Sequence, residues 1–257
     1  MVRSFRRSSF EVTAARLAGV AILGALAAAS GVNGCSDLGS APQVEPPPPP
    51  PMETVTVEAT RDATLYEEVS GGLASGAGLR LFAGATLTDA IRRSVLHFDL
   101  SGIDVPGALV RAELTLTATP TGNASPAVRT LTLHRVTESW SEGTSVPPEP
   151  GGFGTPAGVG DVTWLHRDFD TVLWSTPGGS FDPAASGSAM VGGAGVYKWT
   201  GTGLAVDVQA WLDDPSGNHG WLLRGEEAVS QSAKRFGSRE SGTKPVLTLV
   251  FQPPVPR

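Results

Sequence analysis

The sequence holds a single cysteine, Cys35, among its 257 residues. No thiol is left downstream for a disulfide or a nucleophile, so any folded domain there must depend on its core. The chain also lacks a His-Glu-x-x-His pair and a Gly-x-Ser-x-Gly turn, and its four histidines form no other closely spaced pair. The usual signatures of a zinc hydrolase and of a serine hydrolase are therefore missing.

Basic residues are scarce as well. The first 34 residues hold four Arg and one Glu, and the rest of the chain has 15 basic residues against 24 acidic ones. No run of Lys or Arg alternates with aromatic residues. An acidic domain repels phosphate backbones, so we expect no nucleic-acid partner.

No apolar run is long enough for a comfortable membrane span. The longest, residues 17–32, comes after a positively charged start and fits the apolar region of a signal peptide. It ends in Val32-Asn33-Gly34-Cys35, which resembles the lipobox of bacterial lipoproteins, although Asn33 is an unusual occupant. We therefore predict a signal peptide over 1–34, lipidation of Cys35 and anchoring of the exported chain to the bacterial membrane or cell surface.

The stretch after the leader is rich in proline. Residues 35–53 include six consecutive prolines, 46–51, which favour a stiff polyproline II spacer. From residue 54 to residue 252 apolar and polar residues alternate, as in Ala112, Leu114 and Leu116, and the runs are separated by Pro/Gly turns. This pattern predicts an all-β domain of antiparallel strands, with long Gly/Pro-rich loops, one short helix over 204–212 and a tail over 253–257.

The order of short motifs in this domain resembles the DNRLRE domain of bacterial and archaeal surface proteins. The matching motifs are Arg61-Asp62-Ala63-Thr64-Leu65, 93–101, 133–144, 160–164, 174–179, 207–212, 220–223 and 234–240. The resemblance implies a jelly-roll-like β-sandwich, and some members act as carbohydrate-binding modules of polysaccharide-degrading enzymes. His97 stands where the family more often has Arg, which puts binding of an anionic ligand at that position in doubt.

Two groups of residues are candidates for ligand binding. Trp164 and Trp174 lie in a long Gly/Pro-rich excursion over 145–203, either as sugar-stacking platforms or as the core of the loop. The second group is basic and comprises Arg80, Arg92, Arg93, Lys234, Arg235 and Arg239, with His97 as a further candidate. If the first and last strands are neighbours, these residues could form one cationic face. Such a face suits the carboxylates of uronic-acid polysaccharides. The structural alternative is internal pairing, for example of Arg239 with Glu240 or Asp62.

Acidic residues allow two further interpretations. Glu138 and Glu142 flank Trp140, and Asp168 and Asp170 lie close together, so either pair could serve a glycosidase. The structural interpretation is that these carboxylates bind loop N–H groups. Clustered acids could also hold a structural Ca²⁺, although no EF-hand loop is present.

These observations together favour a non-catalytic cell-surface module that binds polysaccharide. A structural or adhesive lipoprotein with a protein partner is the alternative, and a glycan-degrading hydrolase is a third possibility. The sequence does not fix the oligomeric state.

Overall fold

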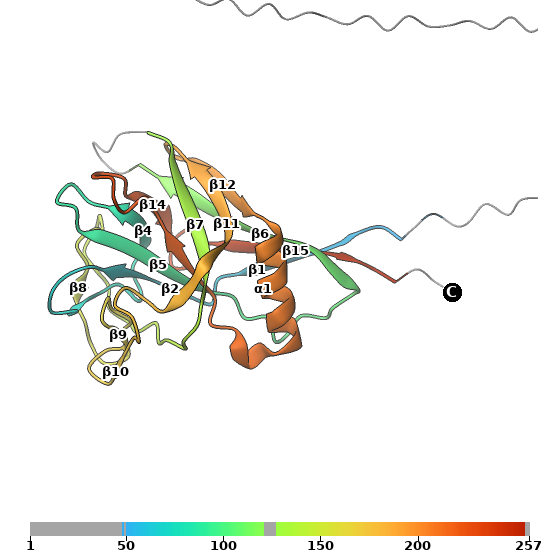
Figure 1. Ribbon diagram of the computed structural model, residues 1–257, viewed down its shortest axis with the longest axis horizontal. Coiled ribbons are helices and arrows are strands. Elements are labelled where there is room, and N and C mark those ends of the chain that lie inside the picture. Colours follow the sequence, from blue (N-terminus) through green and yellow to red (C-terminus); the bar gives the residue numbers. More distant parts are fainter. Residues whose placement is uncertain (1–47, 49, 121–126, 255–257) are drawn as a thin grey trace, which may run out of the picture. The chain divides into compact units, whose positions relative to one another are not determined.

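The computed structural model describes residues 48, 50–120 and 127–254. The predicted all-β class is confirmed, because strands dominate these residues and a single α-helix accompanies them (Figure 1). The signal peptide over 1–34 and Cys35 lie outside the described residues. No helix in the described part of the chain is both long and apolar enough to cross a membrane.

The strands have between two and 12 residues, and some of the longer ones show the predicted alternation of buried and exposed side chains. They are β1 (Glu53–Glu58), β2 (Arg61–Tyr66), β3 (Leu73–Ala74), β4 (Arg80–Ala85), β5 (Ile91–His97), β6 (Ala108–Thr119), β7 (Arg129–Val136), β8 (Thr155–Pro156), β9 (His166–Asp168), β10 (Val172–Leu173), β11 (Phe181–Val191), β12 (Gly195–Thr200), β13 (Trp221–Arg224), β14 (Lys234–Gly237) and β15 (Val246–Gln252).

Eight of these strands form a closed antiparallel barrel. The pairing runs β6-β12-β11-β7-β13-β5-β4-β14 and returns to β6, while β1 and β15 extend from β6, and β2 pairs with β5. Closure depends on the 12-residue length of β6, which pairs with β15 along Ala108–Thr115 and with β14 at Ala118 and Thr119. The pairing path therefore differs from the expected two-sheet, jelly-roll-like sandwich, since a strand this long reaches both partners.

The main core fills the inside of the barrel. In β6 and β15 the inward residues are Leu114, Leu116, Leu247 and Leu249, all fully buried, and their neighbours in sequence face outward. This is the period of two that the sequence predicts for these strands. Trp199 of β12 is also buried here.

Helix α1 (Thr202–Asp213) matches the predicted helix and packs on β6 and β11. Leu204, Val208 and Trp211 are its buried apolar side chains. A Cβ atom on Gly187 of β11 would lie 2.2 Å from Leu204, so the sheet under the helix needs a residue without a side chain. A short 3₁₀ turn, η1 (Pro215–Gly217), comes after the helix.

A second core lies on the outer side of β2, β5 and β13. The segment 137–180, which contains the first part of the predicted excursion and is called the excursion from here on, covers this side and buries Trp140, Trp164 and Trp174 against it. Val95 and Leu96 are neighbours in β5 but belong to different cores, because successive side chains of a strand point to opposite faces. These strands therefore bury both faces, whereas the alternating pattern predicts one buried face each.

The excursion also ends earlier than expected. The prediction extended it from 145 to 203, but residues 181–191 and 195–200 form β11 and β12 of the barrel. The prediction was wrong there because β11, with Pro183, Ala184, Ala185 and Gly187, has few large apolar residues. Its small residues leave room for α1.

Candidate functional site

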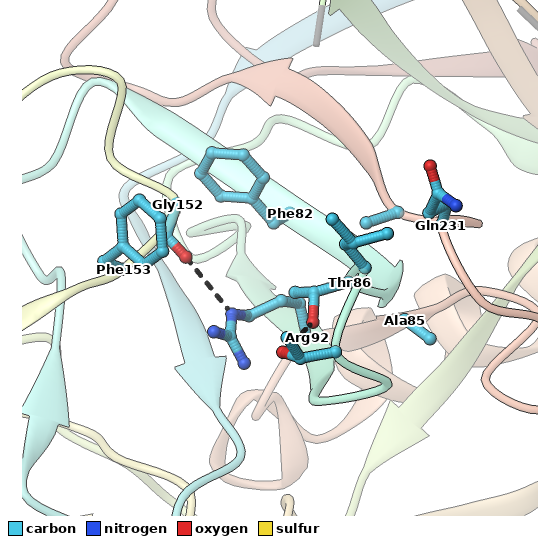
Figure 2. Close-up of a pocket in the computed structure, with 10 residues that line it drawn as sticks. Phe82, Ala85, Thr86, Arg92, Gly152, Phe153 and Gln231 are labelled. Carbon is cyan, nitrogen blue, oxygen red and sulfur yellow. Dashed lines mark hydrogen bonds between the residues drawn. The ribbon is translucent and has the colours of Figure 1, made fainter. Parts of the chain in front are cut away.

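A pocket of about 610 Å³ opens beside β4 and β5 (Figure 2). Its wall is built by β4 and the turn after it, by one residue of β5, by the excursion and by the segment before β14. The lining residues are Phe82, Ala85, Thr86, Leu87, Thr88, Arg92, Gly152, Phe153, Gln231 and Ala233. Three segments far apart in sequence, namely the β4–β5 hairpin, the excursion and the segment before β14, thus meet at one hollow whose wall is mostly carbon.

Hydrogen bonds to its main chain fix the position of Phe82 at this pocket. The N–H of Phe82 lies 3.1 Å from the hydroxyl oxygens of Thr64 and Ser94, and the Ser94 hydroxyl donates to the Phe82 carbonyl at 2.9 Å. All of these groups are buried, so β2, β4 and β5 are held together by satisfied hydroxyl groups. The aromatic ring therefore has a fixed base on the sheet.

Arg92 is the one charged residue among the described residues that line the pocket. It lies on β5 and is buried, with its guanidinium carbon 5.0 Å from the centre of the Tyr66 ring. Its Nε donates to the Gly152 carbonyl at 3.3 Å and its Nη1 to the Ile91 carbonyl at 2.9 Å. Burial lowers the pKa of Arg92, although Tyr66 and Glu67 oppose the shift; the side chain still remains a cation at any physiological pH.

The excursion closes one side of the pocket. The Tyr66 hydroxyl donates to the Gly151 carbonyl at 2.8 Å, which seats the turn that carries Gly152 and Phe153. Gly151 has a φ of 81°, a conformation that favours glycine. Figure 2 shows Phe82, Phe153 and the Arg92 guanidinium gathered on the same side of the hollow.

The rim of the pocket is apolar and exposed. Phe153 is 81% exposed and Leu87 is 72% exposed. A single exposed apolar side chain is ordinary, but here two large ones flank a hollow that contains a buried cation. Neither rim residue was predicted from the sequence, nor was Phe82; the only signal was an aromatic residue inside the Gly-rich stretch 151–154.

The predicted cationic face does not form as one surface. Arg80 and Arg235 do lie on the neighbouring strands β4 and β14, but Arg80 pairs with Glu149 at 3.4 Å and Arg235 donates to the Thr119 hydroxyl at 2.9 Å. Lys234 is buried and donates to backbone carbonyls, including that of Gly192 at 2.9 Å. β1 and β15 are neighbours, as expected, but none of these cations lies on them.

Arg93 and Arg239 are held by carboxylates. Arg93 binds Glu227, and its guanidinium lies over the ring of Trp164 at 4.9 Å. Arg239 makes two hydrogen bonds with Glu142, at 2.6 and 2.7 Å, and lies 2.9 Å from Glu240. For these two residues the geometry is that of the internal-pairing alternative.

The two loop tryptophans are parts of the second core. Trp164 and Trp174 are both buried, and the Trp174 Nε1 donates to the Thr163 carbonyl at 3.1 Å. This arrangement is the loop-core alternative, and it leaves no ring face open for stacking on a sugar. Trp140 is buried as well, with its Nε1 donating to the His219 carbonyl at 2.9 Å.

His97 lies away from the pocket, at the end of β5. Its Nδ1 is 2.8 Å from the Thr60 hydroxyl. Burial and the nearby Arg61 lower the pKa of His97 to about 4, although Asp99 opposes the shift. The imidazole is therefore neutral at physiological pH and offers no charge to an anionic ligand.

The candidate acid pair has structural partners. Glu138 accepts hydrogen bonds from the backbone N–H and the hydroxyl of Ser175, and Glu142 accepts the backbone N–H of Asp62 at 2.7 Å. Glu138 thus binds a loop N–H group, as the structural interpretation predicts, whereas Glu142 binds an N–H group of strand β2. None of the described residues that line the Arg92 pocket carries a carboxylate.

A second hollow of about 580 Å³ lies between β1 and the loop after β5, and Asp99 and Asp104 line it. The backbone N–H of Ser101 donates to Asp99 and lowers its pKa, so Asp99 stays a carboxylate. In the described ranges no group of three or more His, Cys, Asp or Glu is placed to hold a metal ion. The structural Ca²⁺ stays a prediction.

No protein-family model and no curated protein matches the chain. A function must therefore be inferred from the pocket and its residues.

Proposed function

We propose that this chain is an exported, lipid-anchored surface module that binds polysaccharide without catalysing a reaction. The observation that carries the proposal is the pocket in which aromatic carbon and one buried cation meet, at Phe82, Phe153 and Arg92. Sugar rings stack their C–H faces on aromatic rings, and a few polar groups then fix their orientation. Gln231 lines the same hollow and supplies such a group with its side-chain amide.

The pocket lies on the β4 side of the folded domain. β1, which comes after the Pro-rich stretch, extends to one side of the domain, and β4 and β14 lie at the opposite side in Figure 1. A ligand at the β4 side would thus meet the face remote from the start of the domain. The motif order of the DNRLRE domain is in keeping with such a role, and the closed barrel would then be a variant of the jelly-roll-like fold of that family.

A surface lipoprotein with a protein partner is the second candidate. The exposed Phe153 and Leu87 favour it, because apolar groups at the rim are common at protein interfaces. The hollow between them favours the polysaccharide instead, since a flat apolar patch would suffice for a protein. The same variants test both candidates.

The test is retention of the full-length chain by insoluble and gel-embedded polysaccharides, acidic and neutral. We expect retention by at least one acidic polymer and a loss of about tenfold or more in affinity for Phe153→Ser and for Arg92→Gln. Arg111→Gln is the matched control, because Arg111 is exposed at the other end of β6. Release of reducing ends by the wild type would instead support the hydrolase.

Failure to bind any polymer would overturn the proposal. So would binding that Phe153→Ser leaves unchanged, because the ligand would then lie elsewhere. Phe153 is largely exposed, so this substitution is not expected to unfold the domain.

A further inference from the structure

Arg92 forms no ion pair with any described residue. Arginine has five N–H donors, and the hydrogen bonds to Gly152 and Ile91 use two of them. Glu67 attracts the guanidinium only from beyond ion-pair distance, and its carboxylate accepts the Ile91 N–H at 2.7 Å. By contrast, Arg80, Arg93 and Arg239 each pair directly with a carboxylate.

A buried cation without a direct counter-ion is an unfavourable arrangement. Removing a guanidinium from water is costly unless an anion and hydrogen bonds replace the lost hydration. The Tyr66 ring stabilises the cation from one side, and the remaining N–H groups belong to a side chain that lines the pocket. A carboxylate there would accept two parallel hydrogen bonds in a medium that strengthens the attraction.

The rest of the wall does not suit a hydroxyl-rich ligand. Phe82, Ala85, Leu87, Phe153 and Ala233 offer only carbon from their side chains. The Thr86 hydroxyl is already engaged, since it accepts the Ala90 N–H at 3.1 Å and lies 3.2 Å from the Thr88 hydroxyl. A sugar hydroxyl pressed against the apolar part of this wall would lose water without gaining a partner, so hydroxyls beyond those that reach Gln231 weaken binding.

We propose that the Arg92 pocket binds a carboxylate carried on an apolar carbon skeleton, aliphatic or aromatic, in preference to a hydroxyl-rich uronate. This deepens the proposed function, on which it rests, by making the recognised unit an apolar acid substituent of the bound polymer. Arg92 binds the carboxylate, and Phe82, Phe153 and Leu87 bind the carbon skeleton. The volume of about 610 Å³ is in the range of sites for small organic ligands.

The experiment titrates the full-length chain with four probes of similar size: benzoate, hexanoate, galacturonate and galactose. Isothermal titration and ligand-observed NMR measure the affinities. We expect benzoate and hexanoate to bind about tenfold or more tightly than galacturonate, and galactose to bind weakest. Arg92→Gln and Phe153→Ser should each weaken benzoate binding about tenfold, whereas Arg111→Gln should leave it unchanged.

Each outcome bears on one of the two proposals. If galacturonate or galactose binds more tightly than benzoate, or if no acid binds, the preference for an apolar acid is overturned. Retention by polysaccharide that depends on Phe153 would still support the proposed function in that case. If Arg92→Gln fails to fold, Phe153→Ser still tests the site. Unchanged benzoate binding by Phe153→Ser would overturn the assignment of the acid to this pocket.

Discussion

Arg93 and Glu227 form a largely buried ion pair with two hydrogen bonds, and it joins β5 to the segment after β13. Their hydrogen bonds measure 2.7 Å from Nε and 3.1 Å from Nη2, and the two side chains are 12% and 8% exposed. Arg93 also donates from Nη1 to the Gly178 carbonyl at 2.9 Å, so the same guanidinium holds the end of the excursion. Burial alone would raise the pKa of Glu227, but hydrogen bonds from Arg93 and Arg224 lower it.

Removing one partner of this pair should destabilise the domain strongly. Arg93→Met leaves the largely buried Glu227 carboxylate with Arg224, which lies 2.9 Å away, as its ion-pair partner. We expect a loss of about 3 kcal/mol in the free energy of unfolding, measured by urea denaturation, because broken buried pairs cost about 3–5 kcal/mol and Arg224 limits the loss. The double variant Arg93→Met/Glu227→Leu should lose less than the sum of the two single variants. Strict additivity would show that the two residues are not coupled.

Trp164 and Phe153 should respond differently to truncation. Trp164 is buried in the second core, whereas Phe153 stands at the pocket rim. We expect Trp164→Ala to cost about 3–5 kcal/mol of stability and Phe153→Ala to stay within about 0.5 kcal/mol of the wild type. Thermal and urea unfolding measure both values. A small effect of Trp164→Ala would make this tryptophan a candidate sugar platform again.

Asp62 should make the domain less stable as the pH rises. Burial is the main cause that raises the pKa of Asp62 well above its ordinary value; Glu240 adds to the rise, and the hydrogen bond from the Arg239 N–H opposes it. The folded state therefore keeps a proton that the unfolded state releases near pH 3.9, so the contribution of Asp62 to stability is highest below that pH and falls as the pH approaches the folded pKa. The slope is at most about 1.4 kcal/mol per pH unit.

Asp62→Asn should flatten this slope, because the amide oxygen can still accept the Arg239 N–H. Urea unfolding at a series of pH values from about 4 to about 9 checks the expectation. Asp104→Asn, at an exposed acid, is the matched control and should keep the wild-type slope. An equal slope in wild type and Asp62→Asn would contradict the assignment.

The fold class was readable from the sequence wherever one strand face is buried. The large apolar residues Leu114, Leu116, Leu247 and Leu249 of β6 and β15 recur at every second position and face inward, and α1 ends before Asp214-Pro215 as expected. β11 was not readable, since Gly187 is needed where Leu204 packs on the sheet. The small residues of β11 are typical of a loop in the sequence, and their role becomes clear only when α1 is seen to pack on them.

The second core left a readable signal that the alternating pattern obscured. Val95-Leu96 and Trp221-Leu222-Leu223 are runs of consecutive apolar residues, and such runs indicate strands that are buried on both faces. In the fold, Val95 and Leu222 belong to the second core, whereas Leu96, Trp221 and Leu223 belong to the barrel core. These two strands could therefore have been assigned two buried faces from the sequence.

The site was less predictable, because its residues come together only through barrel closure and the seating of the excursion. Arg92 was among the candidate residues, but nothing in its sequence neighbourhood separates it from Arg93. The two alternate along β5 to opposite sides, where one meets the pocket and the other meets Glu227. Which arginine faces a hollow thus depends on segments that lie far away in the sequence.

His97 should remain neutral well below the pH at which an exposed histidine becomes charged. Because its pKa falls to about 4, NMR titration should show its ring resonances unchanged until the pH approaches that value. Arg61→Gln should raise this pKa, since the guanidinium disfavours the imidazolium, and Asp99→Asn should lower it further. Titration of His97 near pH 6.5 would contradict the burial of its ring.

The lowered pKa of His97 also sets the sign of its effect on the pH dependence of stability. The unfolded state gains a proton near pH 6.5 and the folded state only near pH 4, so the contribution of His97 is fully present above pH 6.5 and is lost as the pH falls toward 4. His97→Gln keeps a polar partner for the Thr60 hydroxyl and removes the titration. Urea unfolding at about pH 7 and at about pH 4.5 should therefore show a smaller acid loss for His97→Gln than for the wild type. The difference in acid loss between the wild type and His97→Gln reports on His97 alone, because His134 and His219 are present in both proteins.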